Sequence, residues 1–280
     1  RFAFGIDPGG ENTAIAIKAW EAQGFDVRVI NPMGLHADKP WGLRQDGFEI
    51  FEFLDPDDPQ FAALTEMFAD LLTPRTGGEQ GSSQFFKDAA QAAKQMEIMH
   101  IRTAHPPEEH HLGTLYRNVN LPADEWEKHL EAMKANPAAD GLIAAEAAAL
   151  ERREAQAPEE FSAIMSTVQQ DLRWLADPLV RACMKRRDVD FGALKGVNRE
   201  GKPVKGCIIM VVLPLEYVET HSAISRLALG CAIWAMQRGT LAREKVLFIL
   251  DEAAALGKLK RLPNWLATLR KYRVVLWPIF

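Results

Sequence analysis

The sequence has few cysteines and no long apolar segment. Its three cysteines, Cys183, Cys207 and Cys231, stand alone, with no Cys-x-x-Cys pair and no Cys/His ligand spacing. They exclude a disulfide framework and indicate a reducing, cytosolic compartment. No apolar run reaches the roughly 18 residues that a membrane-spanning helix needs. These residues are therefore expected to contain no transmembrane helix.

Two further motifs are missing. Residues 1–4, Arg-Phe-Ala-Phe, are typical of a strand and lack the charged region and cleavage site of a signal peptide. No segment matches Gly-x-x-x-x-Gly-Lys-Ser/Thr, the loop whose backbone amides and lysine cradle phosphates. A chain that opens directly on a strand is expected to be part of a longer protein.

Charge is distributed unevenly along the 280 residues, of which 48% are hydrophobic. Residues 1–180 hold 15 Lys and Arg against 30 Asp and Glu, whereas residues 181–280 hold 18 against 8. This division is compatible with an acidic face for a partner protein and a basic face for nucleic acid or phosphate. An ordinary solvated surface explains it equally well.

Apolar patterns predict an α/β fold with a helical insertion. Strands are predicted at 2–6 and 25–30 around a helix at 13–21, and at 206–213, 246–250 and 274–279 around helices at 224–237 and 262–271. The run at 206–213 is continuously apolar, as in a parallel sheet buried on both faces. Helical spacing without strands predicts an inserted all-α domain at 61–187, and residues 1–60 and 188–280 are predicted to form the α/β domain.

The clearest chemical signal is Asp251-Glu252, which follows the apolar run Leu247–Leu250. A buried strand that ends in Asp-Glu has the Walker B arrangement. Asp251 would lie beside bound magnesium, and Glu252 would orient and deprotonate the attacking water. The alternative is an ordinary strand that ends in an acidic surface turn.

The residues after this pair resemble the C-terminal motor region of type IV secretion coupling proteins. In that family an Asp-Glu strand end leads to an Ala-Leu-Gly turn, a helix ending near an arginine, and a final strand running into a glutamine. Here Ala255-Leu256-Gly257, a helix pattern reaching Arg270, and the apolar run 274–280 follow in that order. In the first of several further segments that resemble the family, Gly9 replaces the family's lysine. These segments are 7–12, 29–32, 53–59, 85–90 and 211–214.

The resemblance implies a RecA-like P-loop ATPase core with a mostly parallel sheet and an inserted all-α domain. It implies ATP and Mg²⁺ as cofactors, Asp251 as the metal ligand, and Glu252 and Arg270 as catalytic residues, with Arg270 reaching phosphate across a subunit boundary. Arg270 also fits a solvated helix-end cation. The phosphate loop and a membrane anchor are expected upstream of Arg1, so no cofactor-binding residue is assigned. The chain as given is expected neither to bind ATP tightly nor to hydrolyse it.

The implied function is a homohexameric coupling ATPase at the cytoplasmic face of the bacterial inner membrane. Its helical domain would bind a relaxase or effector cargo, and ATP hydrolysis would drive cargo and DNA to the other subunits of a type IV secretion channel. An FtsK/HerA-like DNA translocase is one alternative, although such motors lack a helical insertion at this position. A nucleotide-independent cargo-binding adaptor is another.

Other residues are weaker candidates. Asp7 and Glu11 lie in the first turn, where Gly9 replaces the lysine. His105, His110 and His111 lie near Glu108-Glu109, but adjacent histidines point to opposite sides, which favours a solvated loop over a metal site. Two basic groups, 185–187 and 258–261, fit phosphate contacts or solubilising charge, and three tryptophans are predicted core residues: Trp126, Trp174 and Trp234.

Overall fold

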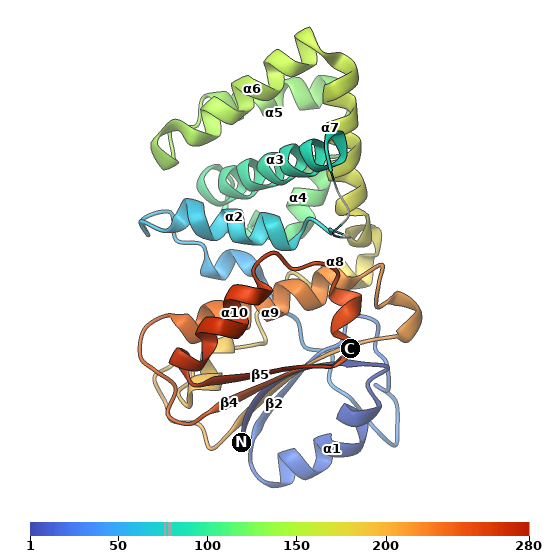
Figure 1. Ribbon diagram of the computed structural model, residues 1–280, viewed down its shortest axis with the longest axis vertical. Helices are drawn as coiled ribbons and strands as arrows, with labels where there is room; N and C mark the ends of the chain where they lie inside the picture. Colours follow the sequence, from blue (N-terminus) through green and yellow to red (C-terminus); the bar gives the residue numbers. More distant parts are fainter. Residues whose placement is uncertain (76, 78–79, 280) are drawn as a thin grey trace. The chain divides into compact units, whose positions relative to one another are not determined.

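The computed structural model describes residues 1–75, 77 and 80–279, which divide into two compact units (Figure 1). The α/β unit contains Arg1–Phe48 and Ala182–Phe280, and the helical unit contains Glu49–Arg181. The helical unit starts before the predicted residue 61 because the short helix η1 (Ile50–Phe53) packs with it: the Phe53 and Phe68 rings lie 6.4 Å apart. Among the described residues, no helix combines the length and apolarity needed to cross a membrane.

The α/β unit is built on a five-stranded sheet whose neighbouring strands are all parallel. Its strand order is β2-β3-β1-β4-β5. The strands are β1 (Phe2–Pro8), β2 (Asp26–Ile30), β3 (Cys207–Leu213), β4 (Val246–Leu250) and β5 (Val274–Pro278). The prediction of an α/β fold with a mostly parallel sheet is confirmed.

Helices cover the two faces of this sheet according to the direction of each connection. The connection from β1 to β2 runs one way along the sheet, and those from β3 to β4 and from β4 to β5 run the other way. Crossovers between parallel strands are right-handed, so helices in connections that run in opposite directions along the sheet lie on opposite faces. Accordingly, α1 (Glu11–Ala22) lies on one face, and α9 (Ser222–Gln237) and α10 (Leu262–Thr268) lie on the other (Figure 1).

The face that carries α1 is only partly covered. Ala14 and Ile17 of α1 pack on Val27, Val29 and Val212 of β2 and β3. On β4 and β5 the same face presents four apolar side chains, which we call the bare face: Leu247, Ile249, Val275 and Trp277. The Val275 and Trp277 side chains are 46% and 59% exposed. The described residues thus leave an apolar part of a central sheet open to solvent.

The helical unit is organised around α3 (Ser82–Ala104), which packs against four other helices. Its helices are α2 (Phe61–Leu71), α4 (Leu112–Asn118), α5 (Ala123–Lys134), α6 (Leu142–Gln156), α7 (Pro158–Asp171) and the start of α8 (Pro178–Cys183). One buried side of α3 carries Lys94, Glu97 and His100 among apolar neighbours. Lys94 Nζ lies 2.6 Å from Asp171 Oδ2, and these two side chains are 0% and 1% exposed.

The chain leaves and re-enters the α/β unit at one place, which we call the neck, formed by residues 45–48 and 183–191. Gly47 N donates to Asp188 Oδ2 at 2.9 Å, and Asp188 N donates to Gly47 O at 3.1 Å. Any Cβ at Gly47 would lie 2.1 Å from Cys183 O, so the close approach requires glycine. Arg186 also belongs to the neck, where it donates to Gln45 O at 2.6 Å.

Candidate active site

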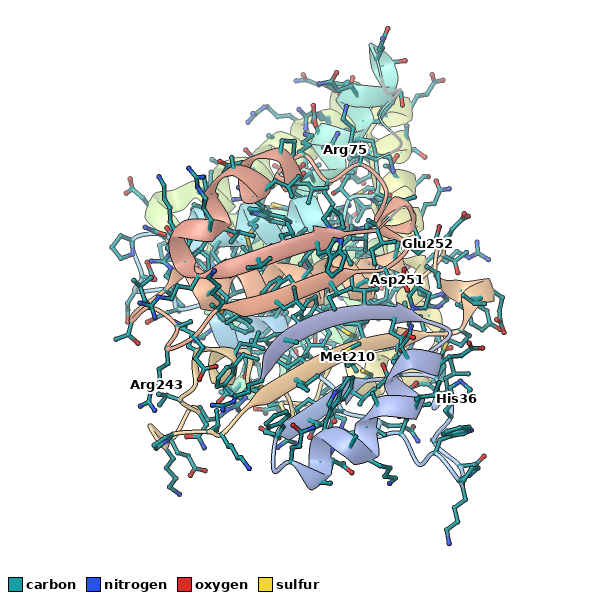
Figure 2. All side chains as sticks on the ribbon, turned by 60° about the horizontal axis from the view of Figure 1, so that its bottom comes forward. His36, Arg75, Met210, Arg243, Asp251 and Glu252 are labelled. Carbon is teal, nitrogen blue, oxygen red and sulfur yellow. The ribbon has the colours of Figure 1, made fainter. Side chains whose placement is uncertain are left out.

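The candidate site lies at the carboxyl ends of β1 and β4. In open parallel sheets, ligands bind beyond these ends where neighbouring strands connect to opposite faces. Here β1 and β4 are neighbours, and their outgoing connections contain α1 and α10 on opposite faces. Asp251 and Glu252 follow β4 at this end (Figure 2). The strand predicted at 246–250 has the observed bounds, so the sequence placed the pair correctly.

Asp251 and Glu252 are held by backbone contacts that leave carboxylate oxygens available. Asp251 N donates to Ile6 O at 3.3 Å, and Asp251 Oδ1 accepts from Glu252 N at 3.1 Å. Within the part of the chain that the structure describes, Asp251 Oδ2 and the Glu252 carboxylate have no hydrogen-bond partner. The Asp251 carboxylate is therefore available to bind a cation, and the Glu252 carboxylate is available to accept a proton from water.

Glu252 adopts a left-handed backbone conformation, with φ 52° and ψ 48°. For a residue with a Cβ this conformation costs about 1–2 kcal/mol. The next residue is anchored, because Ala253 N donates to Ile279 O at 2.7 Å. Strained residues of this kind concentrate at functional sites. The sharp turn presents the exposed Glu252 side chain at the edge of the site.

Arg226 of α9 also supports this turn, a role that the sequence patterns did not indicate. Its side chain is buried, and its Nη1 lies 3.1 Å from Ser222 Oγ and 3.5 Å from Leu256 O. Leu256 ends η7 (Ala253–Leu256), the short helix that begins after Glu252. The available signal was a single charged residue, an arginine, within the mostly apolar helix sequence 222–237.

Asp7 lies at the carboxyl end of β1, but its carboxylate is already occupied. The side chain is 2% exposed and accepts from Thr13 N at 2.7 Å, from Thr13 Oγ1 at 2.5 Å and from Asn12 Nδ2 at 3.0 Å. These bonds satisfy amides at the start of α1. Asp7 therefore holds the first turn in place, and Glu11 is exposed at the helix start.

Arg270 lies at the other end of the sheet. It belongs to η8 (Leu269–Tyr272), which precedes the pairing of Val274 with Val246, whereas Asp251 follows the last pair of the same strands. Strands of this length separate their ends by about 13 Å. Arg270 lines a cavity of about 390 Å³ together with Lys245, Arg273, Val274 and Val275. Within one chain, the predicted catalytic residues Glu252 and Arg270 therefore lie at opposite ends of the sheet.

The remaining candidates have mixed outcomes. Trp126 and Trp174 are buried, as predicted, but Trp234 is only half-buried, with the Arg238 guanidinium 3.8 Å from its ring centre. The second basic group presents exposed Lys258 and Lys260 after η7. The adjacent histidines His110 and His111 make separate local contacts, to His105 O and to Thr114 N.

Comparison with known proteins places these features in one family. A family model described as type IV secretory system conjugative DNA transfer matches residues 5–280. The chain is 22% identical over 291 residues to a probable conjugal transfer protein TraG of Sinorhizobium fredii, covering 97% of this chain and 44% of that protein. Over 124 residues it is 27% identical to the conjugal transfer protein TraG of Rhizobium radiobacter, covering 44% and 18%. The chain thus spans less than half the length of these relatives.

Solved structures show the same fold. The bacterial conjugative coupling protein TrwBdeltaN70 matches with a TM-score of 0.56 and 12% identity, covering 99% of this chain and 60% of that one. TrwB in complex with ADP and Mg²⁺ matches with a TM-score of 0.54 and 11% identity, covering 99% and 62%. This likeness confirms the predicted fold, a parallel-sheet α/β core with an inserted all-α unit. Because the family model spans nearly all residues, the chain belongs to the type IV secretory system conjugative DNA transfer family.

Proposed function

We propose that the whole protein is a conjugative coupling ATPase, which uses ATP hydrolysis to drive relaxase-bound DNA or an effector protein to a type IV secretion channel. The observation that carries this proposal is the placement of Asp251 and Glu252 together at the carboxyl end of a buried parallel strand. Membership of the conjugative DNA transfer family supports it. The nucleotide complexes of TrwB support ATP as the energy source.

The residues present fit magnesium. Carboxylate oxygens are the side-chain ligands that Mg²⁺ takes, and Asp251 Oδ2 has no hydrogen-bond partner within the described ranges. When bound, Mg²⁺ would neutralise phosphate charge. The part played by this chain is to hold the ion through Asp251 and to orient a water and accept its proton through Glu252.

Arg270 is proposed to act on a neighbouring subunit of a homohexamer. Arg270 and Asp251 lie at opposite ends of the sheet, too far apart to share one site within one chain. In a ring of identical subunits, the Arg270 end of one sheet can face the Asp251 end of its neighbour. Lys245, Arg270 and Arg273 give the cavity at this end three cationic side chains. Arg270 and Lys245 have no carboxylate partner among residues 1–75, 77 and 80–279. This cavity is suited to receive phosphate charge.

The bare face supports a phosphate-binding strand and helix elsewhere in the whole protein. A strand added beside β5 and joined to β1 would connect in the same direction along the sheet as β1 to β2. A right-handed crossover then places its helix on the face of α1, over β4 and β5. That position is the bare face, so we propose that the loop between this strand and helix holds the phosphates next to Glu252.

Replacing Trp277 with lysine is expected to destabilise the whole protein more than the 280-residue chain. Trp277 is 59% exposed here, whereas a packed helix would bury it, and burying a large apolar side chain contributes about 1.5–3 kcal/mol. Urea unfolding of both proteins measures the difference. Leu241→Lys, at an exposed loop position, is the control and should have an equally small effect in both. Equal small losses for Trp277→Lys would contradict the proposed packing.

The helical unit is proposed to bind the cargo protein, and the whole protein to be anchored in the inner membrane, with its motor on the cytoplasmic face beside the other channel subunits. The acidic composition of the helical unit suits a receptor for a basic protein surface.

The proposed function predicts that donor cells without the gene nick the plasmid normally but transfer none of it. A reintroduced whole gene should restore transfer. Transfer at the normal frequency by the deleted donor would refute a coupling role.

A further inference from the structure

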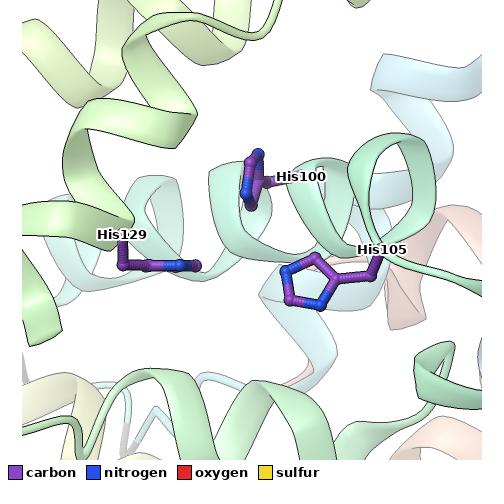
Figure 3. Close-up of side chains that lie close together, drawn as sticks. All are labelled: His100, His105 and His129. Carbon is purple, nitrogen blue, oxygen red and sulfur yellow. The ribbon is translucent and has the colours of Figure 1, made fainter.

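Three histidines converge inside the helical unit (Figure 3). His100 belongs to α3, His105 directly follows α3, and His129 belongs to α5. One ring nitrogen from each lies within 4.8 Å of the others. No ligand spacing along the chain marks this group, because His129 comes from a separate helix. The tertiary fold, rather than a local motif, brings the rings together.

Carboxylates hold two of the three rings. His105 Nδ1 lies 2.6 Å from Glu109 Oε2, and His129 Nε2 lies 2.8 Å from Glu97 Oε1. A histidine that binds a metal through one nitrogen commonly donates its other N–H to a carboxylate, which fixes the ring and makes it a stronger ligand. His105 Nε2 and His129 Nδ1 then present lone pairs. Neither atom has a hydrogen-bond partner in the described part of the chain.

Glu97 lacks a permanent positive partner. Its side chain is 2% exposed, and its contacts are His129 Nε2 and, at 3.4 Å, Asn118 Nδ2. No lysine or arginine of the described ranges forms an ion pair with it. A buried carboxylate is costly without a compensating charge. A cation bound to the opposite nitrogen of His129 would supply that charge.

The third ring belongs to His100, which is buried. Burial lowers the pKa of His100 to about 4 from its usual 6.5. His100 contributes a nitrogen to the cluster from the interior side, while His105 and His129 are reachable from solvent, with 17% and 10% of their side chains exposed.

We propose that His100, His105 and His129 form a binding site for a divalent transition-metal ion, with Zn²⁺ as the best match. Imidazole suits zinc, and three histidines with a water complete a tetrahedral shell. Zinc–nitrogen bonds of about 2.0–2.1 Å place tetrahedral ligand atoms about 3.4 Å apart, so nitrogens that lie within 4.8 Å of one another must approach by up to about 1.4 Å. Small shifts of His105 and His129 together with their carboxylate partners would provide this movement. The site is separate from the proposed nucleotide chemistry and does not depend on it.

Asn136 provides a discriminating test. Its Oδ1 accepts from Ala138 N at 3.0 Å, and its Nδ2 donates to Thr103 Oγ1 at 2.9 Å and lies 3.1 Å from His100 Nδ1. Because the Asn136 amide nitrogen is a donor, this orientation favours a lone pair on His100 Nδ1 and the proton on His100 Nε2. A metal bound through His100 Nε2 requires the opposite tautomer. Asn136→Asp places an acceptor against Nδ1, so it should favour the metal-binding tautomer.

Titration of the metal-free 280-residue chain with ZnCl₂, followed by calorimetry, tests the site. We expect one equivalent of zinc per chain. His105→Gln and His129→Gln should each weaken binding by about 10- to 100-fold, and Asn136→Asp should tighten it by about 10-fold, as changes in metal-site ligation and support typically do. His221→Gln, outside the cluster, is the matched control and should bind as the unmodified chain does.

Cobalt titration adds a spectroscopic readout, because tetrahedral Co²⁺ absorbs strongly in the visible range. Zinc binding of equal strength in the unmodified chain and His129→Gln would overturn the site, as would the absence of binding. Weaker or equal binding by Asn136→Asp would overturn coordination through His100. Loss of folding cannot explain tighter zinc binding by Asn136→Asp, so this test does not depend on whether the other variants are destabilised.

Discussion

Glu252→Gln is expected to lower ATP turnover by the whole protein by a factor of about 10²–10⁴, the usual loss when a general base is removed. The amide keeps the size and shape of the side chain but cannot accept a proton from water. ATP binding should persist, because Glu252 is exposed beside the site and its side chain makes no hydrogen bond within the described residues, while its backbone bonds are unchanged by the substitution. Steady-state hydrolysis and equilibrium binding of a labelled ATP analogue measure the two effects separately.

Asp251→Asn is the matched comparison at the adjacent position. It should weaken the magnesium dependence of nucleotide binding as well as turnover, because Asp251 is the proposed ligand. Normal hydrolysis by Glu252→Gln would remove the proposed catalytic role. Absence of ATP hydrolysis by the unmodified whole protein during active DNA transfer would instead favour a nucleotide-independent adaptor.

Mixing two inactive variants tests whether Arg270 acts between subunits. A whole protein carrying Arg270→Ala keeps Glu252, and one carrying Glu252→Gln keeps Arg270. In randomly mixed rings, about a quarter of the interfaces would combine an intact Glu252 with an intact Arg270. Hydrolysis should therefore reappear on mixing. Continued inactivity of mixed rings would exclude this arrangement.

Asp171→Asn is expected to lower the free energy of unfolding of the helical unit by about 3–5 kcal/mol, the usual cost of leaving a buried charge without its partner. Asp171 accepts from Lys94 at 2.6 Å and from Lys87 at 2.7 Å. Lys94 is fully buried, so water cannot replace the lost carboxylate charge. Urea unfolding followed by far-ultraviolet circular dichroism measures the loss.

Two further variants separate the charge effect from other causes. The double substitution Lys94→Met with Asp171→Leu removes both charges and should recover part of the stability, since apolar replacements of buried pairs are often neutral or stabilising. Glu160→Gln breaks a half-exposed pair with Arg153 and should cost less than about 1 kcal/mol. A loss from Asp171→Asn as small as that from Glu160→Gln would contradict the importance of burial.

Local patterns predicted the elements of the α/β unit well. The run at 246–250 is apolar and ends in two acids, so both the strand and the position of Asp251 followed from the sequence. The helix predicted at 262–271 is divided into α10 and η8, because the chain tightens to a 3-10 turn before β5. The strand order could not be read from such patterns, since it depends on pairing between residues far apart, as in Phe4 opposite Phe248.

Side-chain roles that depend on tertiary contacts were the main omissions. Asp7 was a weak candidate for phosphate chemistry, but its bonds to Thr13 and Asn12 show that it supports α1. The histidines were judged from their neighbours in sequence, where His110 and His111 are adjacent. The spatial group instead joins His105 with His100 and His129, and no periodicity in the sequence connects them.

The neck has an evolutionary consequence. Both ends of the insertion are fixed by contacts among residues 45–48 and 183–191, including the paired bonds between Gly47 and Asp188 and the 5.6 Å edge-to-face contact of Phe48 with Phe191. These contacts are expected to hold the register of β2 and β3 whatever folded segment lies between the anchors. A gene exchange that replaces residues 49–181 is therefore expected to leave β2 and β3 in place, so that recombination at the neck would exchange the proposed cargo receptor without altering the α/β unit.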